Sequence, residues 1–233
     1  MKQLLLLHLT ARSGSKPELS TRLVELATEW CQRLEGELIS ATVMVAHEDD
    51  PFRMAGNATA ARAFDASIEV ELEVEDAHNQ FEDLGRGFGS RFGAWIDPAL
   101  SVAQVGSKQI FRSCEPTPIR YQYCMKRRDD LTTEAYLRHY AEVHSKFGLM
   151  MEGIEGYTQI HLEPEATARV MDLSGLTFRH FSSVSVLHLA SVAEFLEGAR
   201  ANSASGFAED EEKFVDRPQS LMWVSDEVFR TTA

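Results

Sequence analysis

Three polar residues that could act on a substrate alternate along one predicted strand. Tyr157, Gln159 and His161 occupy every second position of residues 154–163, so their side chains share one face. An imidazole with an ordinary pKa of about 6.5 can move a proton at neutral pH, while hydroxyl and amide groups can hold a substrate oxygen. We predict that His161 transfers protons and that Tyr157 and Gln159 bind substrate. The alternative is a solvated face, or one that meets polar groups of another element.

A second group lies on a predicted helix that follows Thr132 and runs to about residue 150. His139 and His144 are five positions apart, so their side chains point about 140° apart on a straight α-helix. We therefore do not expect them to coordinate one metal ion together. Tyr140 and His144 share a stripe of this helix. We predict His144 as a further general acid or base, with His139 and Tyr140 in substrate binding. A stripe packed into the core, with a hydrogen-bonded His144, remains equally open.

The strand predicted at residues 119–126 carries aromatic side chains on one face. Tyr121, Tyr123 and Met125 alternate with polar and charged residues, and we expect the aromatic face to pack on helices. Tyr123 could still donate its hydroxyl to an enolate or carbonyl oxygen, so it is a candidate catalytic residue. His188, on the strand predicted at 180–189, is placed in the pocket wall or the core and is a candidate for substrate binding.

Composition excludes several classes of protein. The 233 residues carry a net charge of −13, which repels nucleic acid and anionic membranes, so neither is expected as a partner. The three cysteines lie far apart without a CxxC pair, so no disulfide framework or structural metal is predicted. The apolar start ends at His8 and resembles a strand rather than a signal peptide. We expect a cytoplasmic protein with no membrane span.

The order of predicted elements repeats once along the chain. Strands at 2–9, 37–47, 64–75 and 100–112 enclose helices at 17–35 and 77–95, and after residues 115–118 the same β-α-β-β-α-β order returns. The second set comprises strands at 119–126, 154–163, 180–189 and 219–228 and helices at 132–150 and 191–200, with a loop containing Pro164 and Gly175 and a short acidic turn at 208–214.

The repeated β-α-β-β-α-β order predicts an α+β protein of two ferredoxin-like halves, residues 1–114 and 118–233. Each half leaves one sheet face uncovered, and packing these faces together would form a fused barrel with a pocket between them. The face that carries Tyr157, Gln159 and His161 is expected to point into that pocket. The alternatives to a fused barrel are two separate domains joined by a linker, or halves that each pair with another chain.

Two further patterns occur in the first half. Glu69, Glu71, Glu73 and Glu75 alternate with apolar residues, and we expect their strand to extend past the barrel or to lie at an exposed sheet edge. If they faced the barrel, at least one should have a raised pKa. The glycines between Gly85 and Gly89 fall inside a helical stretch, so nucleotide binding is not predicted. No GxSxG motif is present.

Several stretches of the second half together resemble a known family. They are Met125–Tyr136, His139–His144, Gly156–His161 and Lys213–Asp216. This series resembles the EthD domain family of the dimeric α+β-barrel superfamily, over residues 119–229. The first half has the same order of elements without these motifs and is interpreted as a diverged copy. Where the family commonly continues with Gly-Pro after the second helix histidine, this chain has Ser145 and Lys146 after His144.

The resemblance implies a barrel that relatives usually build from two chains, here fused into one that would be a monomer or homodimer. It also implies a small-molecule enzyme without a cofactor, of lyase, decarboxylase, cyclase or isomerase type, acting on an apolar or aromatic carbonyl or phenolic compound. Some relatives are monooxygenases and others bind haem, so a haem-dependent or cofactor-free monooxygenase is one alternative. A non-catalytic ligand-binding protein is the other.

Overall fold

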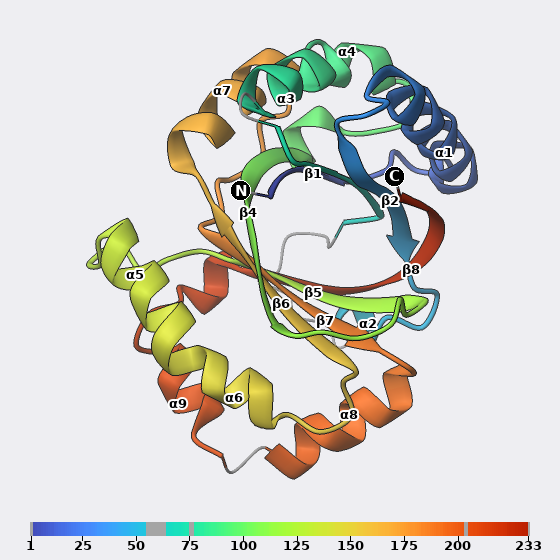
Figure 1. Cartoon of the computed structure of the whole chain (residues 1–233). Coiled ribbons are helices and arrows are strands. Elements are labelled where there is room, and N and C mark those ends of the chain that lie inside the picture. Colours follow the sequence, from blue (N-terminus) through green and yellow to red (C-terminus); the bar gives the residue numbers. More distant parts are fainter. Residues whose placement is uncertain (1, 55–63, 75–76, 203–204, 233) are drawn as a thin grey trace.

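The chain forms a closed antiparallel barrel of eight strands with helices on two opposite sides (Figure 1). The computed structural model describes residues 2–54, 64–74, 77–202 and 205–232. The strands are β1 (Gln3–Leu9), β2 (Leu38–Ala46), β3 (Ala66–Leu72), β4 (Val102–Arg112), β5 (Ile119–Met125), β6 (Gly156–Leu162), β7 (Ser183–Leu189) and β8 (Leu221–Thr232). The longer helices are α1 (Lys16–Arg33), α3 (Ala77–Gly85), α7 (Pro164–Ser174) and α8 (Val192–Ala201). The shorter ones are α2 (Pro51–Met54), α4 (Phe88–Phe92), α5 (Thr133–His139), α6 (Ser145–Met150) and α9 (Phe207–Glu211).

The barrel consists of two ferredoxin-like sheets joined at both edges. The first sheet has the order β2-β3-β1-β4 and the second the order β6-β7-β5-β8. Antiparallel pairing of β2 with β8 and of β4 with β6 closes the ring. The second strand of each half therefore pairs with the fourth strand of the other, as a two-fold relation between the halves requires. The predicted fused barrel is confirmed.

Charged side chains fill part of the barrel interior. Glu69 and Glu71 on β3 are 4% and 7% exposed, and both pair with Lys108 of β4. The expectation of an exposed position was wrong for Glu69 and Glu71, because a closed barrel has no edges, but Glu73 lies past the end of β3 and is exposed, as expected. Burial alone would raise the pKa of Glu69, but the charges of Lys108 and Arg120 lower it to about 2. Glu75 lies outside the described residues.

The helices follow the sequence pattern with two exceptions. On α1 the apolar positions that include Leu19, Leu23 and Trp30 are buried, as their helical spacing predicts. The helix predicted at 77–95 is broken, because Gly87 has a φ of +68°, which ends a helix. Residues 164–174, predicted as loop, form α7 instead. None of the described helices combines the length and apolarity that a bilayer crossing needs.

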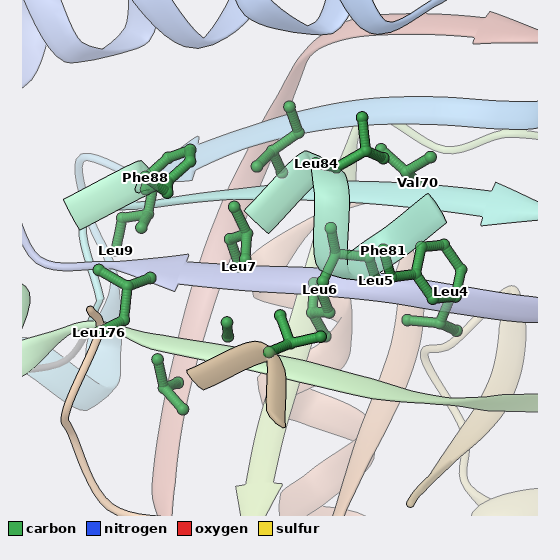
Figure 2. Close-up of a cluster of buried hydrophobic side chains, with 14 of the residues drawn as sticks. Leu4, Leu5, Leu6, Leu7, Leu9, Val70, Phe81, Leu84, Phe88 and Leu176 are labelled. Carbon is green, nitrogen blue, oxygen red and sulfur yellow. The ribbon is translucent and has the colours of Figure 1, made fainter. Parts of the chain in front are cut away.

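Buried apolar side chains cover the outer face of the first sheet. Figure 2 shows leucines of β1 meeting Phe81, Leu84 and Phe88 of α3 and α4. Helix α7 leaves the second half and lies beside α3 on this same side of the barrel (Figure 1). The Thr167 hydroxyl on α7 accepts a hydrogen bond of 3.0 Å from the Val105 amide of β4. One helical layer is thus closed over the first half of the chain.

Candidate functional site

A cavity of about 310 Å³ lies between the second sheet and the helices that cover it. Its floor is the outer face of β5 to β8, and its walls come from α2, α6, α8, α9 and the π-helical turn η2 (Tyr140–His144). A second cavity, of about 290 Å³, is lined by residues of both halves, including Glu69, Arg120 and His188. The predicted pocket between the halves is therefore present, but it carries charged side chains and is separate from the cavity under the helices. Most of the lining of the cavity under the helices is apolar, including Phe52, Met125, Phe147, Leu187, Phe195 and Phe207.

His144 is the histidine of the cavity wall, and it is held by a buried carboxylate. Its Nδ1 lies 3.0 Å from Oδ2 of Asp210 on α9, and Asp210 is 2% exposed. The other oxygen, Oδ1, lies 3.1 Å from Nε2 of His139. A carboxylate only accepts hydrogen bonds, so Nδ1 of His144 carries the proton in this pair. Its Nε2 makes no hydrogen bond to the described part of the chain.

The π turn explains how two histidines reach one carboxylate. On a straight α-helix, His139 and His144 would point about 140° apart. The chain switches to a π-helix over Tyr140–His144, and this i→i+5 pattern brings residues five apart onto one side. Both rings therefore reach Asp210. The expected divergence of the two histidines was wrong because the helix is not straight.

The charge state of this pair follows from its surroundings. Burial lowers the pKa of His144, and the hydrogen bond and charge of Asp210 only partly restore it. Burial opposes ionisation of Asp210, yet hydrogen bonds from His144 and His139 hold its pKa below the usual value. Near neutral pH the site therefore contains a neutral imidazole whose Nδ1–H donates to an aspartate. The remaining nitrogen, Nε2, can accept a proton.

Tyr123 and Glu211 place further polar groups in the cavity wall. The Tyr123 hydroxyl is buried and makes no hydrogen bond within the described residues, and the same holds for Oε1 of Glu211. Oε2 of Glu211 pairs with Nε of Arg217 at 3.1 Å. Burial raises the pKa of Glu211, although Arg217 and Tyr123 oppose the rise. Tyr121, Tyr123 and the rest of their face lie toward the helices, as predicted.

Tyr157, Gln159 and His161 form a hydrogen-bonded chain on the helix side of β6. The Gln159 amide donates to the Tyr157 hydroxyl at 2.6 Å, and its oxygen lies 3.0 Å from Nε2 of His161. Their expected position inside the barrel was wrong, because this face of β6 points outward, to the helices. Tyr157 lines the cavity, whereas Gln159 and His161 do not. Burial lowers the pKa of His161 to about 4.

The remaining predicted residues are dispersed. Tyr140 packs beside the ring of His161 at 5.6 Å and does not line the cavity. His139 contacts the site only through Asp210. His188 lies on the opposite face of the sheet, with Arg120 on the neighbouring strand, and burial followed by the charge of Arg120 lowers its pKa to about 4. The catalytic or binding role of each of these side chains stays a prediction.

Sequence reasoning missed the residues of α9. Asp210 and Glu211 fall in the acidic stretch at 208–214, for which the sequence predicts only a short turn and no part in the site. Both are 2% exposed, and each bonds a different partner in or beside the cavity. The available signal was the apolar residues around them, Phe207 and Phe214, which give one side of the segment a buried face. Within the described residues, no cluster of three or more side chains could hold a metal ion.

Comparisons with known proteins support the fold. Residues 128–218 match the EthD domain family, which confirms the resemblance for the second half. An anthrone oxidase-like protein matches with a TM-score of 0.62 at 9% identity, over 100% of this chain and 93% of its own. A protein proposed to be a monooxygenase, from Lactobacillus acidophilus NCFM, matches with a TM-score of 0.55 at 9% identity, over 99% and 96%.

A third structure, a mutant chlorite dismutase from Candidatus Nitrospira defluvii in complex with cyanide, matches with a TM-score of 0.53 at 11% identity, over 98% of this chain and 91% of its own. No curated protein matches the sequence. Identities this low show a common fold and nothing about the reaction.

Proposed function

We propose that this protein with an EthD domain is a cofactor-independent enzyme that moves a proton on a small apolar carbonyl or phenolic compound. The observation that carries the proposal is the pair of His144 and Asp210 at the wall of a largely apolar cavity. A neutral imidazole oriented by a carboxylate is a common general base. A cavity of about 310 Å³ matches a compact ligand of one or two rings, near the lower limit for ligand sites.

Each polar group of the site has a distinct part in such a reaction. Nε2 of His144 takes a proton from an acidic C–H or O–H bond of the bound compound. The carboxylate of Asp210 stabilises the imidazolium that forms, through the 3.0 Å bond to Nδ1. Tyr123 donates its hydroxyl to the oxygen on which negative charge develops. Return of the proton from His144 to another atom completes an isomerisation, or assists departure of a leaving group in a lyase.

The lining residues do not fit a haem group. A cavity of about 310 Å³ is smaller than the macrocycle with its substituents. Its two propionates would also need cations, and Arg217 is the only cation among the described lining residues. Arg217 already pairs with Glu211, whose buried carboxylate would repel a propionate. A Soret band in the absorption spectrum of the purified protein would contradict this conclusion.

Oxygenation of the same compound is a second candidate, favoured by the descriptions of the anthrone oxidase-like and proposed monooxygenase neighbours. His144 would again remove a proton, and the electron-rich anion would react with O₂. One oxygen atom would become a carbonyl oxygen of a quinone product, and the other would leave as water with the two hydrogens that the phenol loses, so the substrate supplies all four electrons that O₂ accepts. Consumption of O₂ in an oxygen electrode with a phenolic compound distinguishes this reaction from simple proton transfer.

Deuterium exchange tests the proposal without knowledge of the natural substrate. We expect the protein to catalyse exchange of the α-protons of 2-tetralone in D₂O, followed by NMR. The His144→Gln variant should abolish this exchange, and Asp210→Asn should reduce it about 100-fold or more, because the imidazole loses its orienting carboxylate. His180→Gln, a histidine outside the cavity, is the matched control. Absence of catalysed exchange from 2-tetralone and related aryl ketones, with binding intact, would favour a non-catalytic binding protein.

A further inference from the structure

Two buried polar atoms without hydrogen-bond partners lie in the wall of the same cavity. They are Oε1 of Glu211 on α9 and the hydroxyl of Tyr123 on β5. The two residues are 2% and 3% exposed. Buried polar groups in native proteins are almost always hydrogen-bonded, and exceptions often mark a binding site.

These two atoms belong to groups that are close to each other. Burial is the main cause of the raised pKa of each group, and their polar contact lowers the pKa of Glu211 and raises that of Tyr123, while Ser220 lowers the pKa of Tyr123. Their geometry is nevertheless not that of a hydrogen bond. The two neighbouring groups therefore offer one acceptor and one donor to the same ligand group.

We infer that Glu211 and Tyr123 together bind one hydroxyl group of the ligand, which makes the substrate class a neutral phenol or enol. The Tyr123 hydroxyl donates to the ligand oxygen, and Oε1 of Glu211 accepts the ligand's hydrogen. This inference rests on the proposed function for the location of the substrate, and it adds the group by which the substrate is recognised. Glu211 is thus a specificity-determining residue that neither the sequence nor the proposed reaction identified.

The same geometry excludes other ligands. A carboxylate would bring a second negative charge beside the buried carboxylate of Glu211, and the available cation, Arg217, already pairs with it at 3.1 Å. A methyl ether has no hydrogen to donate, so Oε1 would stay without a partner. Sites that hydrogen-bond a substrate hydroxyl reject analogues lacking it far more strongly than apolar pockets reject a missing methylene.

Equilibrium binding of three matched naphthalenes tests the inference. Isothermal titration calorimetry would compare 1-naphthol, 1-methoxynaphthalene and 1-naphthoate on the wild-type protein. We expect 1-naphthol to bind about 10-fold or more tightly than either analogue. The Glu211→Met and Tyr123→Phe variants should each reduce that ratio to about 3-fold or less. Glu211→Gln keeps an acceptor and the side-chain shape. The ratio of its affinity for 1-naphthol to its affinity for either analogue should therefore lie between about 3-fold and about 10-fold.

Glu212→Gln is the matched control, because Glu212 is the exposed neighbour on the same segment and also faces Arg217, at 3.7 Å. It should preserve the full preference. Equal binding of 1-naphthol and 1-methoxynaphthalene to the wild type would overturn the inference. So would a preference that survives in both Glu211→Met and Tyr123→Phe, tight binding of 1-naphthoate, or no binding of 1-naphthol at millimolar concentration.

The proposed function and this inference fail separately. The naphthol preference is an equilibrium measurement and needs no turnover, so it should persist in His144→Gln. A preserved naphthol preference without deuterium exchange of 2-tetralone, in a protein shown by calorimetry to bind 2-tetralone, would reject the proton-transfer reaction and keep the hydroxyl site. Exchange that depends on His144, in a protein that binds the ether as well as the phenol, would reject the hydroxyl site alone.

Discussion

His8 makes the stability of the barrel sensitive to acid. It lies inside the barrel on β1, with 0% of its surface exposed. Its Nε2 is 2.9 Å from the Gln122 oxygen of the second half, and its Nδ1 is 2.9 Å from the Gln104 amide nitrogen. Both ring nitrogens are therefore satisfied when the ring is neutral. Burial lowers the pKa of His8 from 6.5 to about 4, although the Gln122 bond and the charge of Glu69 oppose the change.

The direction and size of the pH effect follow from this pKa. Because the pKa is lower in the folded state, the unfolded chain takes up the proton first as the pH falls. The stability from a neutral His8 is thus present above pH 6.5 and is lost toward pH 4. At about 1.4 kcal/mol for each pH unit, the expected loss is about 2 kcal/mol at pH 5 and about 3 kcal/mol at pH 4.

Urea denaturation of the wild type and of His8→Gln at pH 7, 5 and 4 isolates this effect. Glutamine retains a donor and an acceptor inside the barrel but cannot be protonated in this range. The free energy of unfolding should fall more steeply for the wild type, by about 3 kcal/mol between pH 7 and pH 4. All other titrating groups cancel in the difference between the two proteins. Parallel pH profiles would refute the reasoning and show that His8 is protonated within the folded barrel.

Two further substitutions test the barrel and the cavity. Lys108→Met leaves Glu69 and Glu71 in the barrel without their shared cation. The free energy of unfolding, measured in urea, should therefore fall by about 3 kcal/mol or more. A loss below about 1 kcal/mol would show that other groups compensate for the missing cation. Gly148→Ala places a methyl group against the ring of Tyr157, so affinity for 1-naphthol should fall about 10-fold while thermal stability drops by about 1–3 kcal/mol. Gly85→Ala, which places a methyl group against the side chain of Val170 outside the cavity, is the control and should keep the affinity. Unchanged affinity of Gly148→Ala for 1-naphthol in calorimetry would show that Tyr157 does not shape the site.

The fold was largely predictable because it depends on periodicity. Strand alternation and helical spacing are local signals, and the repeated order of elements restricts the topology to a few possibilities. Helix α7 was missed although its signals were present. Pro164 stands at its first position and Gly175, with a φ of +71°, follows its last turn. Both were interpreted as loop residues, whereas they are typical of helix boundaries.

The site was less predictable because it depends on which sheet face meets which layer. Alternation puts Tyr157, Gln159 and His161 on one face, but it does not say whether that face is the inside of the barrel. The π turn at Tyr140–His144 could not be predicted either, because the angle between His139 and His144 was calculated for a straight α-helix. Asp210 and Glu211 look like surface charges, since their burial arises only when α9 packs against η2 and β5.

The fusion of two halves accounts for the asymmetry of the molecule. A barrel made of two identical chains must present the same outer face twice, with the same cavity on each. In this chain the outer face of the first sheet carries leucines such as Leu5 and Leu7, sealed by α1, α3 and α4 and by α7 from the second half. The outer face of the second sheet carries Tyr123 and Tyr157 around a cavity. A single chain needs a ligand cavity on the outer face of only one of its two sheets. The first half is therefore free to close its outer face with apolar side chains and to serve only as structural support for the second half.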